Sequence, residues 1–136
     1  MASIKIVTDS SCDIPLSVAH ELGIEIVPMQ IVIGNQRYRA GLDMTAEQFY
    51  QALQENRTQV AVQPPPVTAF EQLYRRLTLE YEHIFSLHLS SRLVPAYHVA
   101  QQVRNRLPAS SSRVEVIDSK LLSMALGMVV IHAARA

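Results

Sequence analysis

Short apolar runs rich in valine, isoleucine and leucine recur along the chain, and several of them stop at hydroxyl or carboxylate side chains. Runs of this length and composition are typical of strands that are buried on both faces of a parallel sheet. They predict strands at residues 3–8, 24–27, 29–33, 83–89 and 114–117. Gly34 and Asn35 then form a turn signal, and the alternating residues 36–39 predict the second arm of an edge hairpin.

Apolar residues at helical spacing fill the stretches between these runs, and capping signals mark where the helices begin and end. They predict helices at residues 15–22, 45–55, 68–80, 94–107 and 121–134. Gly23 closes the first helix, because glycine permits the left-handed conformation found there. Thr45 with Gln48, and Thr68 with Glu71, have the spacing of a capping box, in which each side chain binds the exposed backbone N–H of the other residue.

Three consecutive prolines, 64–66, follow Gln63. Because proline lacks the backbone donor and fixes φ, we expect residues 58–66 to form an extended connection rather than a helix interior or a central strand. The serines at 110–112 are a second loop signal. Since strands and helices alternate along the chain, we predict an α/β fold of three layers, with a mainly parallel sheet, helices on both faces and an edge hairpin.

Polar side chains follow three of the predicted strands at the point where each strand ends. The segments are Thr8-Asp9-Ser10-Ser11, Ser90-Ser91 and Asp118-Ser119. The carboxyl ends of parallel strands face a common crevice, and the next helix brings unpaired N–H groups to the same place. The sequence therefore predicts a polar site at this edge of the sheet, suited to a ligand with an anionic head group.

Composition limits the classes of function. The chain has 136 residues, 49% of them hydrophobic, which suffices for one domain with a core. Twelve basic and twelve acidic side chains give zero net charge, so no overall field favours nucleic acid or an anionic membrane surface. The single cysteine, Cys12, excludes an internal disulfide and a multi-cysteine metal site. The spacing of the histidines indicates no metal site either, and we expect no cofactor.

Residues 121–134 are apolar nearly all round, but this segment is too short to cross a bilayer core of about 30 Å. We therefore expect no membrane span, and we expect these residues to be covered by protein. The first residues show no signal-peptide pattern, which favours a cytoplasmic protein. Residues 133–136 carry no helix stop signal, and we expect the natural chain to continue.

Two residues raise the alternative of catalysis. Asp9 is placed like a phosphoryl acceptor, although Ser11 stands where such phosphatases carry a second aspartate. A structural role, in which the Asp9 carboxylate accepts hydrogen bonds from the next turn, is favoured. His88 is placed to act as a base toward Ser90, but no acidic residue that would orient its ring is evident from the sequence.

Taken together, the motifs in this order and spacing resemble those of the DegV family of bacterial fatty-acid-binding proteins. The matching segments are Val7-Thr8-Asp9-Ser10, Glu47-Gln48-Phe49-Tyr50, Gln63-Pro64, Leu89-Ser90-Ser91, Ile117-Asp118-Ser119-Lys120, Ser123-Met124 and Gly127. The resemblance spans the whole chain and implies proteins of two α/β domains. It therefore implies that residues 1–136 are the N-terminal α/β domain, truncated before a C-terminal lipid-binding domain.

The resemblance also implies a carrier rather than an enzyme, with no catalytic residue in this chain. In such a carrier a long-chain fatty acid lies in a tunnel. Hydroxyl groups of the N-terminal domain hold its carboxylate together with basic side chains of the C-terminal domain. The carrier presents the acid to a separate fatty acid kinase, which phosphorylates the carboxylate with ATP. Such a site combines an apolar sleeve with a few well-placed hydrogen-bond donors.

The family motifs transfer to this chain only in part. The pattern Thr-Thr-Ser-Gln-Pro is Val60-Ala61-Val62-Gln63-Pro64 here, and Ser-Ser-x-Leu-Ser-Gly-Thr is Ser90-Ser91-Arg92-Leu93-Val94-Pro95-Ala96. On the matching positions, the resemblance assigns ligand binding to Ser10, Ser90, Ser91, Arg92, Ala61 and Gln63. Because hydroxyl groups are lost in both segments, either other donors such as Arg92 compensate or the ligand differs.

We therefore predict a divergent lipid carrier whose partners are a long-chain fatty acid, a fatty acid kinase and a further domain, without nucleic acid. Two alternatives stay open. One is a small-molecule phosphatase or phosphotransferase that uses Asp9, and the lack of a glycine-rich phosphate loop counts against it. The other is a homodimer that packs through residues 121–134 and binds no ligand.

Overall fold

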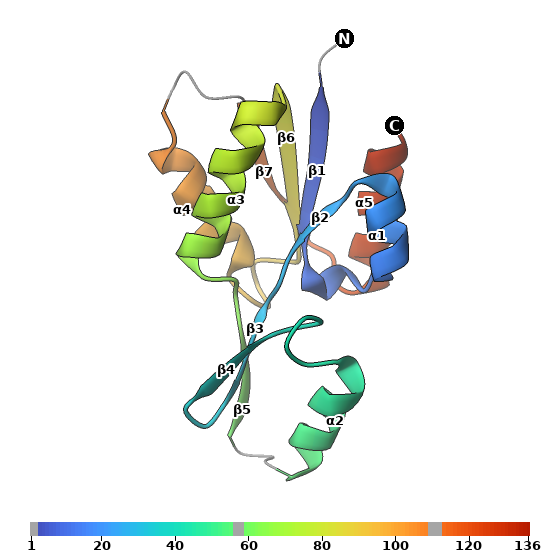
Figure 1. The fold of residues 1–136 in the computed structure, drawn as a ribbon, viewed down its shortest axis with the longest axis vertical. Helices are drawn as coiled ribbons and strands as arrows, with labels where there is room; N and C mark the ends of the chain where they lie inside the picture. The colour runs from blue at the N-terminus through green and yellow to red at the C-terminus, as the bar shows by residue number, and fades with distance from the viewer. Residues whose placement is uncertain (1–2, 56–58, 109–112) are drawn as a thin grey trace.

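The computed structural model describes residues 3–55, 59–108 and 113–136, which form two sheets with helices around them (Figure 1). The first sheet is parallel, with the strand order β2 (Glu25–Val27), β1 (Ile4–Asp9), β6 (His83–His88) and β7 (Arg113–Asp118). The second sheet is antiparallel, with the order β4 (Gln36–Arg39), β3 (Gln30–Ile33) and β5 (Val60–Gln63). The helices are η1 (Ser10–Cys12, a 3₁₀ turn), α1 (Leu16–Leu22), α2 (Ala46–Glu55), α3 (Val67–Glu80), α4 (Ala96–Arg106) and α5 (Met124–Arg135).

Helices cover both faces of the parallel sheet, with α3 and α4 on one face and α1 and α5 on the other (Figure 1). Alternate residues of β1 explain this arrangement, since successive side chains of a strand point to opposite faces. Ile6 packs with Ala19 of α1 and with buried residues of α5, whereas Val7 packs with Phe70 of α3 and with buried residues of α4. The predicted three-layer α/β fold with a mainly parallel sheet is confirmed.

The predicted hairpin forms, but it belongs to the second sheet rather than to an edge of the parallel one. Gly34 at its turn has a φ of +58°, a left-handed conformation that favours glycine. Residues 60–63 pair with β3 in antiparallel register, so the expectation of a plain extended connection is wrong there. The three prolines begin directly after β5, and their missing N–H donors therefore end the strand without interrupting it. Residue 58 and the serines at 110–112 lie outside the described residues.

The two predicted capping boxes have different outcomes. At α2, the N–H of Thr45 donates to Gln48 Oε1 at 2.9 Å and the N–H of Gln48 donates to Thr45 Oγ1 at 3.2 Å, which confirms the first. The second, at Thr68, is wrong, because α3 begins one residue earlier and Pro66 occupies the N-cap position without a side-chain hydrogen bond. Thr68 therefore lies inside the first turn, where its hydroxyl does not cap the free N–H groups.

Helix α5 begins later than the predicted residue 121 and packs closely on η1. A Cβ atom built on Gly127 would lie 2.4 Å from the carbonyl oxygen of Cys12, so the two backbones meet where no side chain fits. Leu126 and Val130 of the same helix are fully buried, whereas Met128 is exposed. No helix in the described part of the chain is long and apolar enough to cross a membrane.

We expect Gly127→Ala to lower the free energy of unfolding by about 1 to 3 kcal/mol, because the added methyl group collides with backbone that cannot move freely. This loss exceeds the gain of up to about 1 kcal/mol that alanine brings to a helix. Urea unfolding followed by circular dichroism measures the change. The control Met128→Ala, at the next and exposed position, should stay within about 0.5 kcal/mol of wild type. Equal stability of Gly127→Ala and wild type would contradict the close approach.

Candidate functional site

A cavity of about 640 Å³ lies between the carboxyl end of the parallel sheet and the second sheet with α2. One side of its wall comes from η1 and the loop that leads to α1, including Ser10, Ser11 and Ile14. The other side comes from the second sheet and α2, including Ile31 and Phe49. Its volume falls within the range of about 300 to 1,000 Å³ that small-molecule sites occupy.

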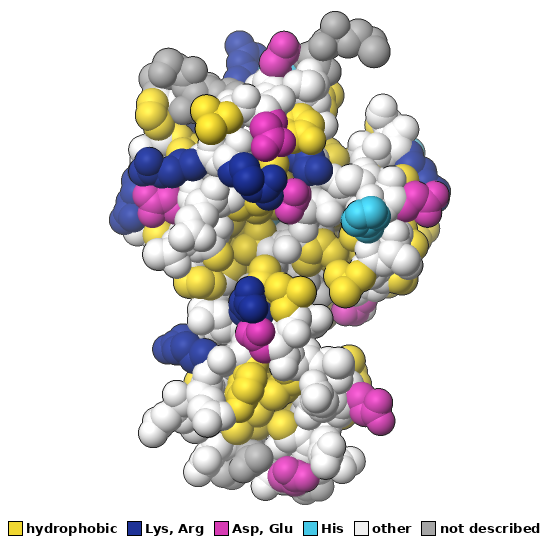
Figure 2. All heavy atoms as spheres, in the orientation of Figure 1, with side chains coloured by type: hydrophobic (Ala, Val, Ile, Leu, Met, Phe, Trp, Pro, Cys, Tyr) yellow, Lys and Arg dark blue, Asp and Glu magenta, His cyan; other side chains and the backbone are white. Residues whose placement is uncertain are grey.

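Large apolar side chains of the cavity wall are open to solvent. Between 45% and 64% of the surface of each is exposed in Leu16, Leu42, Tyr50, Val62 and Leu122. Figure 2 shows hydrophobic side chains gathered where the two parts of the molecule meet and again over the second sheet. Exposed apolar surface that is contiguous, rather than scattered, marks binding sites for apolar ligands or partners. The cavity wall has this property.

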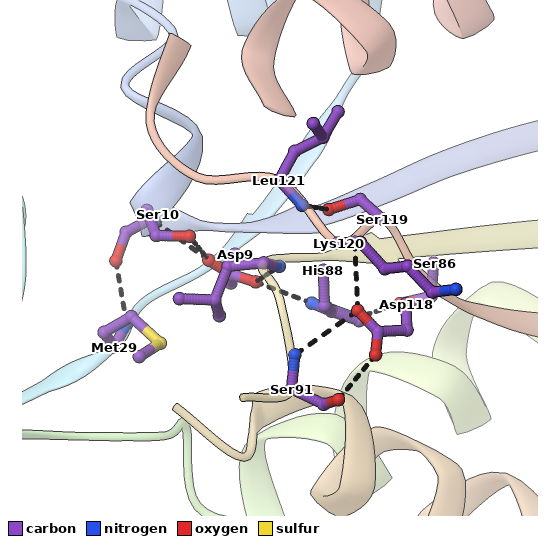
Figure 3. Close-up of polar contacts among 12 residues, drawn as sticks. Asp9, Ser10, Met29, Ser86, His88, Ser91, Asp118, Ser119, Lys120 and Leu121 are labelled. Carbon is purple, nitrogen blue, oxygen red and sulfur yellow. Dashed lines mark hydrogen bonds and ion pairs between the residues drawn. The ribbon is translucent and has the colours of Figure 1, made fainter. Parts of the chain in front are cut away.

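The polar groups in the wall are mainly hydroxyls. Among the residues that the structure describes, the wall contains Ser10, Ser11, Thr45 and Asp13 but no lysine, arginine or histidine. Ser10 Oγ accepts a hydrogen bond from the backbone N–H of Met29 at 2.9 Å, which joins η1 to the segment that enters β3 (Figure 3). An anionic head group would find hydroxyl donors in the described wall, but no cation.

The serine pair after β6 binds neighbouring loops and is not part of the described cavity wall. Ser91 Oγ donates to Asp118 Oδ2 at 2.5 Å, and the N–H of Ser91 donates to Asp118 Oδ1 at 3.3 Å (Figure 3). These two hydrogen bonds from Ser91, together with one from the N–H of Lys120 at 3.0 Å, hold the pKa of Asp118 below its usual value. Ser90 Oγ accepts a weak hydrogen bond from the N–H of Arg92 at 3.4 Å, and Arg92 itself is exposed.

The predicted contacts on β5 lie on the face of the second sheet that is turned away from the cavity. Val62 lines the cavity, so its neighbours Ala61 and Gln63 point to the opposite face. There Gln63 Oε1 accepts a hydrogen bond from Arg37 Nη1 at 2.9 Å. Of the predicted ligand-binding residues, Ser10 is the one that lies in the described wall.

Four polar side chains form a hydrogen-bond chain inside the core, behind the cavity wall. Tyr74 Oη donates to Ser86 Oγ at 2.7 Å. Ser86 Oγ lies 2.7 Å from His88 Nε2, and His88 Nδ1 lies 2.8 Å from Asp9 Oδ2 (Figure 3). All four residues are 0% exposed. An ionised Asp9 only accepts, so Nδ1 carries a proton, and with a neutral ring every donor from Tyr74 to Asp9 has an acceptor.

The sequence did not show an acidic residue that orients His88, but the structure supplies one, Asp9. In the register of the parallel sheet Thr8 pairs with Leu87, so Asp9 and His88 come side by side at the ends of β1 and β6. The sequence signal is that both residues end an apolar run, but neither run shows which other run it will pair with. The ring binds Ser86 rather than Ser90. The described geometry therefore places no base at Ser90.

Burial and hydrogen bonding set the charge state of the groups around β1. Burial alone would raise the pKa of Asp9, but the hydrogen bonds from His88 and Ser11 outweigh it and lower that pKa. The earlier interpretation of Asp9 as a residue that binds the next turn is confirmed by its bond from the N–H of Ser11 at 2.9 Å. Burial raises the pKa of the Cys12 thiol to about 11, so it stays protonated at neutral pH. In the described ranges no three His, Cys, Asp or Glu side chains are grouped to hold a metal ion.

We expect Asp9 to stabilise the fold fully above its ordinary pKa of 3.8 and to lose this contribution as the pH falls through its lower folded value. At pH 7, Asp9→Asn should lower the free energy of unfolding by about 3 to 5 kcal/mol, the usual cost of breaking a buried pair. The difference between the two proteins should narrow below pH 3.8. Urea unfolding between pH 2.5 and pH 7 measures it. Asp43→Asn, at an exposed carboxylate, is the control and should show little effect.

A protein-family description, "Uncharacterised protein, DegV family", matches residues 3–136. The DegV domain-containing protein TTE1491 of Caldanaerobacter subterraneus is 34% identical over 135 residues, which are 99% of this chain and 47% of that protein. Two solved structures have the same fold. A fatty-acid-binding DegV family protein from Thermus thermophilus has a TM-score of 0.87 and 28% identity over 98% of this chain and 46% of that one. DegV of Bacillus subtilis, a fatty acid binding protein, has a TM-score of 0.92 and 25% identity over 99% and 47%.

These comparisons agree with the fold and with the family resemblance found in the sequence. The family match covers nearly the whole chain, whereas the chain spans about half the length of the curated relatives it matches. Fatty-acid binding is named for the two proteins whose structures were solved, and it is a property of those proteins. The chain described here belongs to the DegV family.

Proposed function

We propose that the cavity binds the acyl chain of a long-chain fatty acid and that the protein acts as a lipid carrier. The observation that carries this proposal is the apolar wall, in which large side chains such as Leu42 and Tyr50 stay exposed. An acyl chain would remove this surface from water, with a gain of about 25 cal/mol for each Å². The two structural neighbours that are named as fatty-acid-binding support the same class of ligand.

We propose that residues 1–136 form the N-terminal domain of a longer lipid-binding protein, in keeping with the length of the relatives. A second domain would cover the exposed wall and close it over the acyl chain. It would also supply the cation that the described wall lacks, because a carboxylate held away from water needs charged donors. Met128 and Val129 on α5 are exposed and available to such a domain. A homodimer through this helix stays a prediction.

Ser10 is the head-group contact that we propose first, because its hydroxyl lies in the wall beside the exposed apolar residues. Its proton is free for a carboxylate, since the bond from Met29 uses the oxygen as acceptor. The remaining predicted contacts, Ser90, Ser91, Arg92, Ala61 and Gln63, lie outside the described wall. They stay predictions and require a ligand or a second domain that reaches beyond this cavity.

On this proposal the protein supplies no nucleophile and presents the bound acid to an ATP-dependent fatty acid kinase. Asp9 is 0% exposed, and its carboxylate accepts hydrogen bonds from His88, Ser11 and Leu89. A phosphoryl group has no approach to it, which argues against the alternative of an Asp9-dependent phosphatase or phosphotransferase.

The proposal is tested on the full-length protein, which includes the proposed second domain, by titrating it with oleate in a calorimeter after delipidation and by native mass spectrometry after purification. We expect oleate to bind and Leu42→Asp to weaken binding at least about tenfold, since the new carboxylate enters the apolar wall and repels the ligand. The control Leu79→Asp makes the same change on α3, outside the wall, where Leu79 is 88% exposed. It should leave affinity within about twofold of wild type.

Two results would contradict the proposal. The first is a full-length wild-type protein that carries no lipid and does not bind added oleate. The second is an equal loss of affinity in Leu42→Asp and Leu79→Asp, because binding would then not depend on the cavity wall.

A further inference from the structure

The Asp9 carboxylate holds two parts of the cavity wall by their main chain. Its Oδ1 accepts a hydrogen bond from the N–H of Ser11 at 2.9 Å, and its Oδ2 accepts one from the N–H of Leu89 at 3.3 Å. Ser11 follows β1 and Leu89 follows β6, and both residues line the cavity. The position of this one carboxylate therefore sets how the two segments of the wall lie relative to each other.

His88 fixes the orientation of that carboxylate. Its Nδ1 lies 2.8 Å from Asp9 Oδ2, the oxygen that also binds the N–H of Leu89. The ring is held from its other side by Ser86 Oγ, 2.7 Å from Nε2. The ring of Phe70 packs edge-on against it, with the centroids 5.2 Å apart and the planes at 89°. These contacts leave the imidazole one orientation, and through it they leave the carboxylate one orientation.

Helix α3 completes the chain on the far side from the wall. The hydroxyl of Tyr74 donates to Ser86 Oγ, which directs the proton of Ser86 toward His88. Since all these groups are fully buried, removing one leaves its neighbour without a partner and without water to replace it. The neighbour then turns to find another partner, and the change passes along the chain to Asp9.

We infer that Tyr74, Ser86, His88 and Asp9 are positioning residues for the lipid site, which they shape without touching the ligand. None of the four lines the cavity, yet Asp9 binds two residues that do. The inference rests on the proposed function for the identity of the ligand alone. A purely structural role would cost stability when His88 is replaced. A positioning role also costs affinity in protein that stays folded.

The test compares three variants of the same chain. His88→Leu removes the donor to Asp9, His88→Asn offers its amide N–H in place of Nδ1, and Val103→Ala destabilises the same core cluster from α4, away from Asp9. Oleate affinity is measured by calorimetry, and hydrogen exchange of the Ser11 and Leu89 amides by NMR. We expect His88→Leu to bind oleate at least about tenfold more weakly and to exchange both amides about tenfold faster. His88→Asn should restore affinity to within about threefold, and Val103→Ala should change neither measurement more than about twofold.

The two measurements separate this inference from the proposed function. If wild-type protein does not bind oleate, the proposed function fails, and the exchange rates alone decide the inference. The inference is overturned if the Ser11 and Leu89 amides exchange no faster in His88→Leu than in Val103→Ala. Faster exchange with unchanged oleate affinity also overturns it. If His88→Leu does not fold, Tyr74→Phe takes its place. We expect Tyr74→Phe to accelerate hydrogen exchange of both amides about threefold. Exchange rates equal to those of Val103→Ala would overturn the inference.

Discussion

The hydrogen bonds to the buried carboxylate of Asp9 connect the core of the parallel sheet to the wall of the cavity. A carboxylate out of water is strongly unfavourable unless its oxygens are fully bonded. Asp9 meets this condition through the ring of His88, the main-chain N–H groups of Ser11 and Leu89, and the hydroxyl of Ser11. The donors come from η1 and from the end of β6, whereas Asp9 itself ends β1, so the carboxylate is satisfied only when β1, β6 and η1 are all in place. A partly satisfied arrangement would be worse than an apolar core.

The second sheet and α2 show the opposite balance, because they leave apolar surface open. No residue of α2 is fully buried, and Tyr50 on this helix is exposed where it lines the cavity. The parallel sheet buries apolar residues on both of its faces, whereas the second sheet leaves Val62 exposed in the cavity wall. A ligand that binds the folded state stabilises it by mass action. A bound acyl chain would therefore stabilise the second sheet and α2 most, because these elements have the smallest buried core of their own.

Periodicity and capping signals predicted most of the fold, and the failures have identifiable physical causes. The apolar runs located every strand of the parallel sheet, because a short continuous apolar run lacks the alternation of apolar and polar residues that marks an amphipathic helix. Residues 60–63 were missed as a strand because the prolines beside them dominate the local signal, while pairing with β3 is a long-range property. Asp9 and His88 were recognised separately, but their contact depends on which strands are neighbours in the sheet. Neither fact is encoded within one segment.

The three polar strand ends look alike in sequence, yet the structure gives them different tasks. The end of β1 divides its side chains between the core, which takes Asp9, and the cavity, which takes Ser10. The ends of β6 and β7 use Ser91 and Asp118 to bind each other. Hydroxyl groups that are engaged in this way are poor ligands, so the number of serines at a sheet edge overestimates its capacity to hold an anion. Which head group binds then depends on the hydrogen-bond donors that remain free and on the charges around the opening of the cavity. The described wall of this chain contributes hydroxyl groups but no cation.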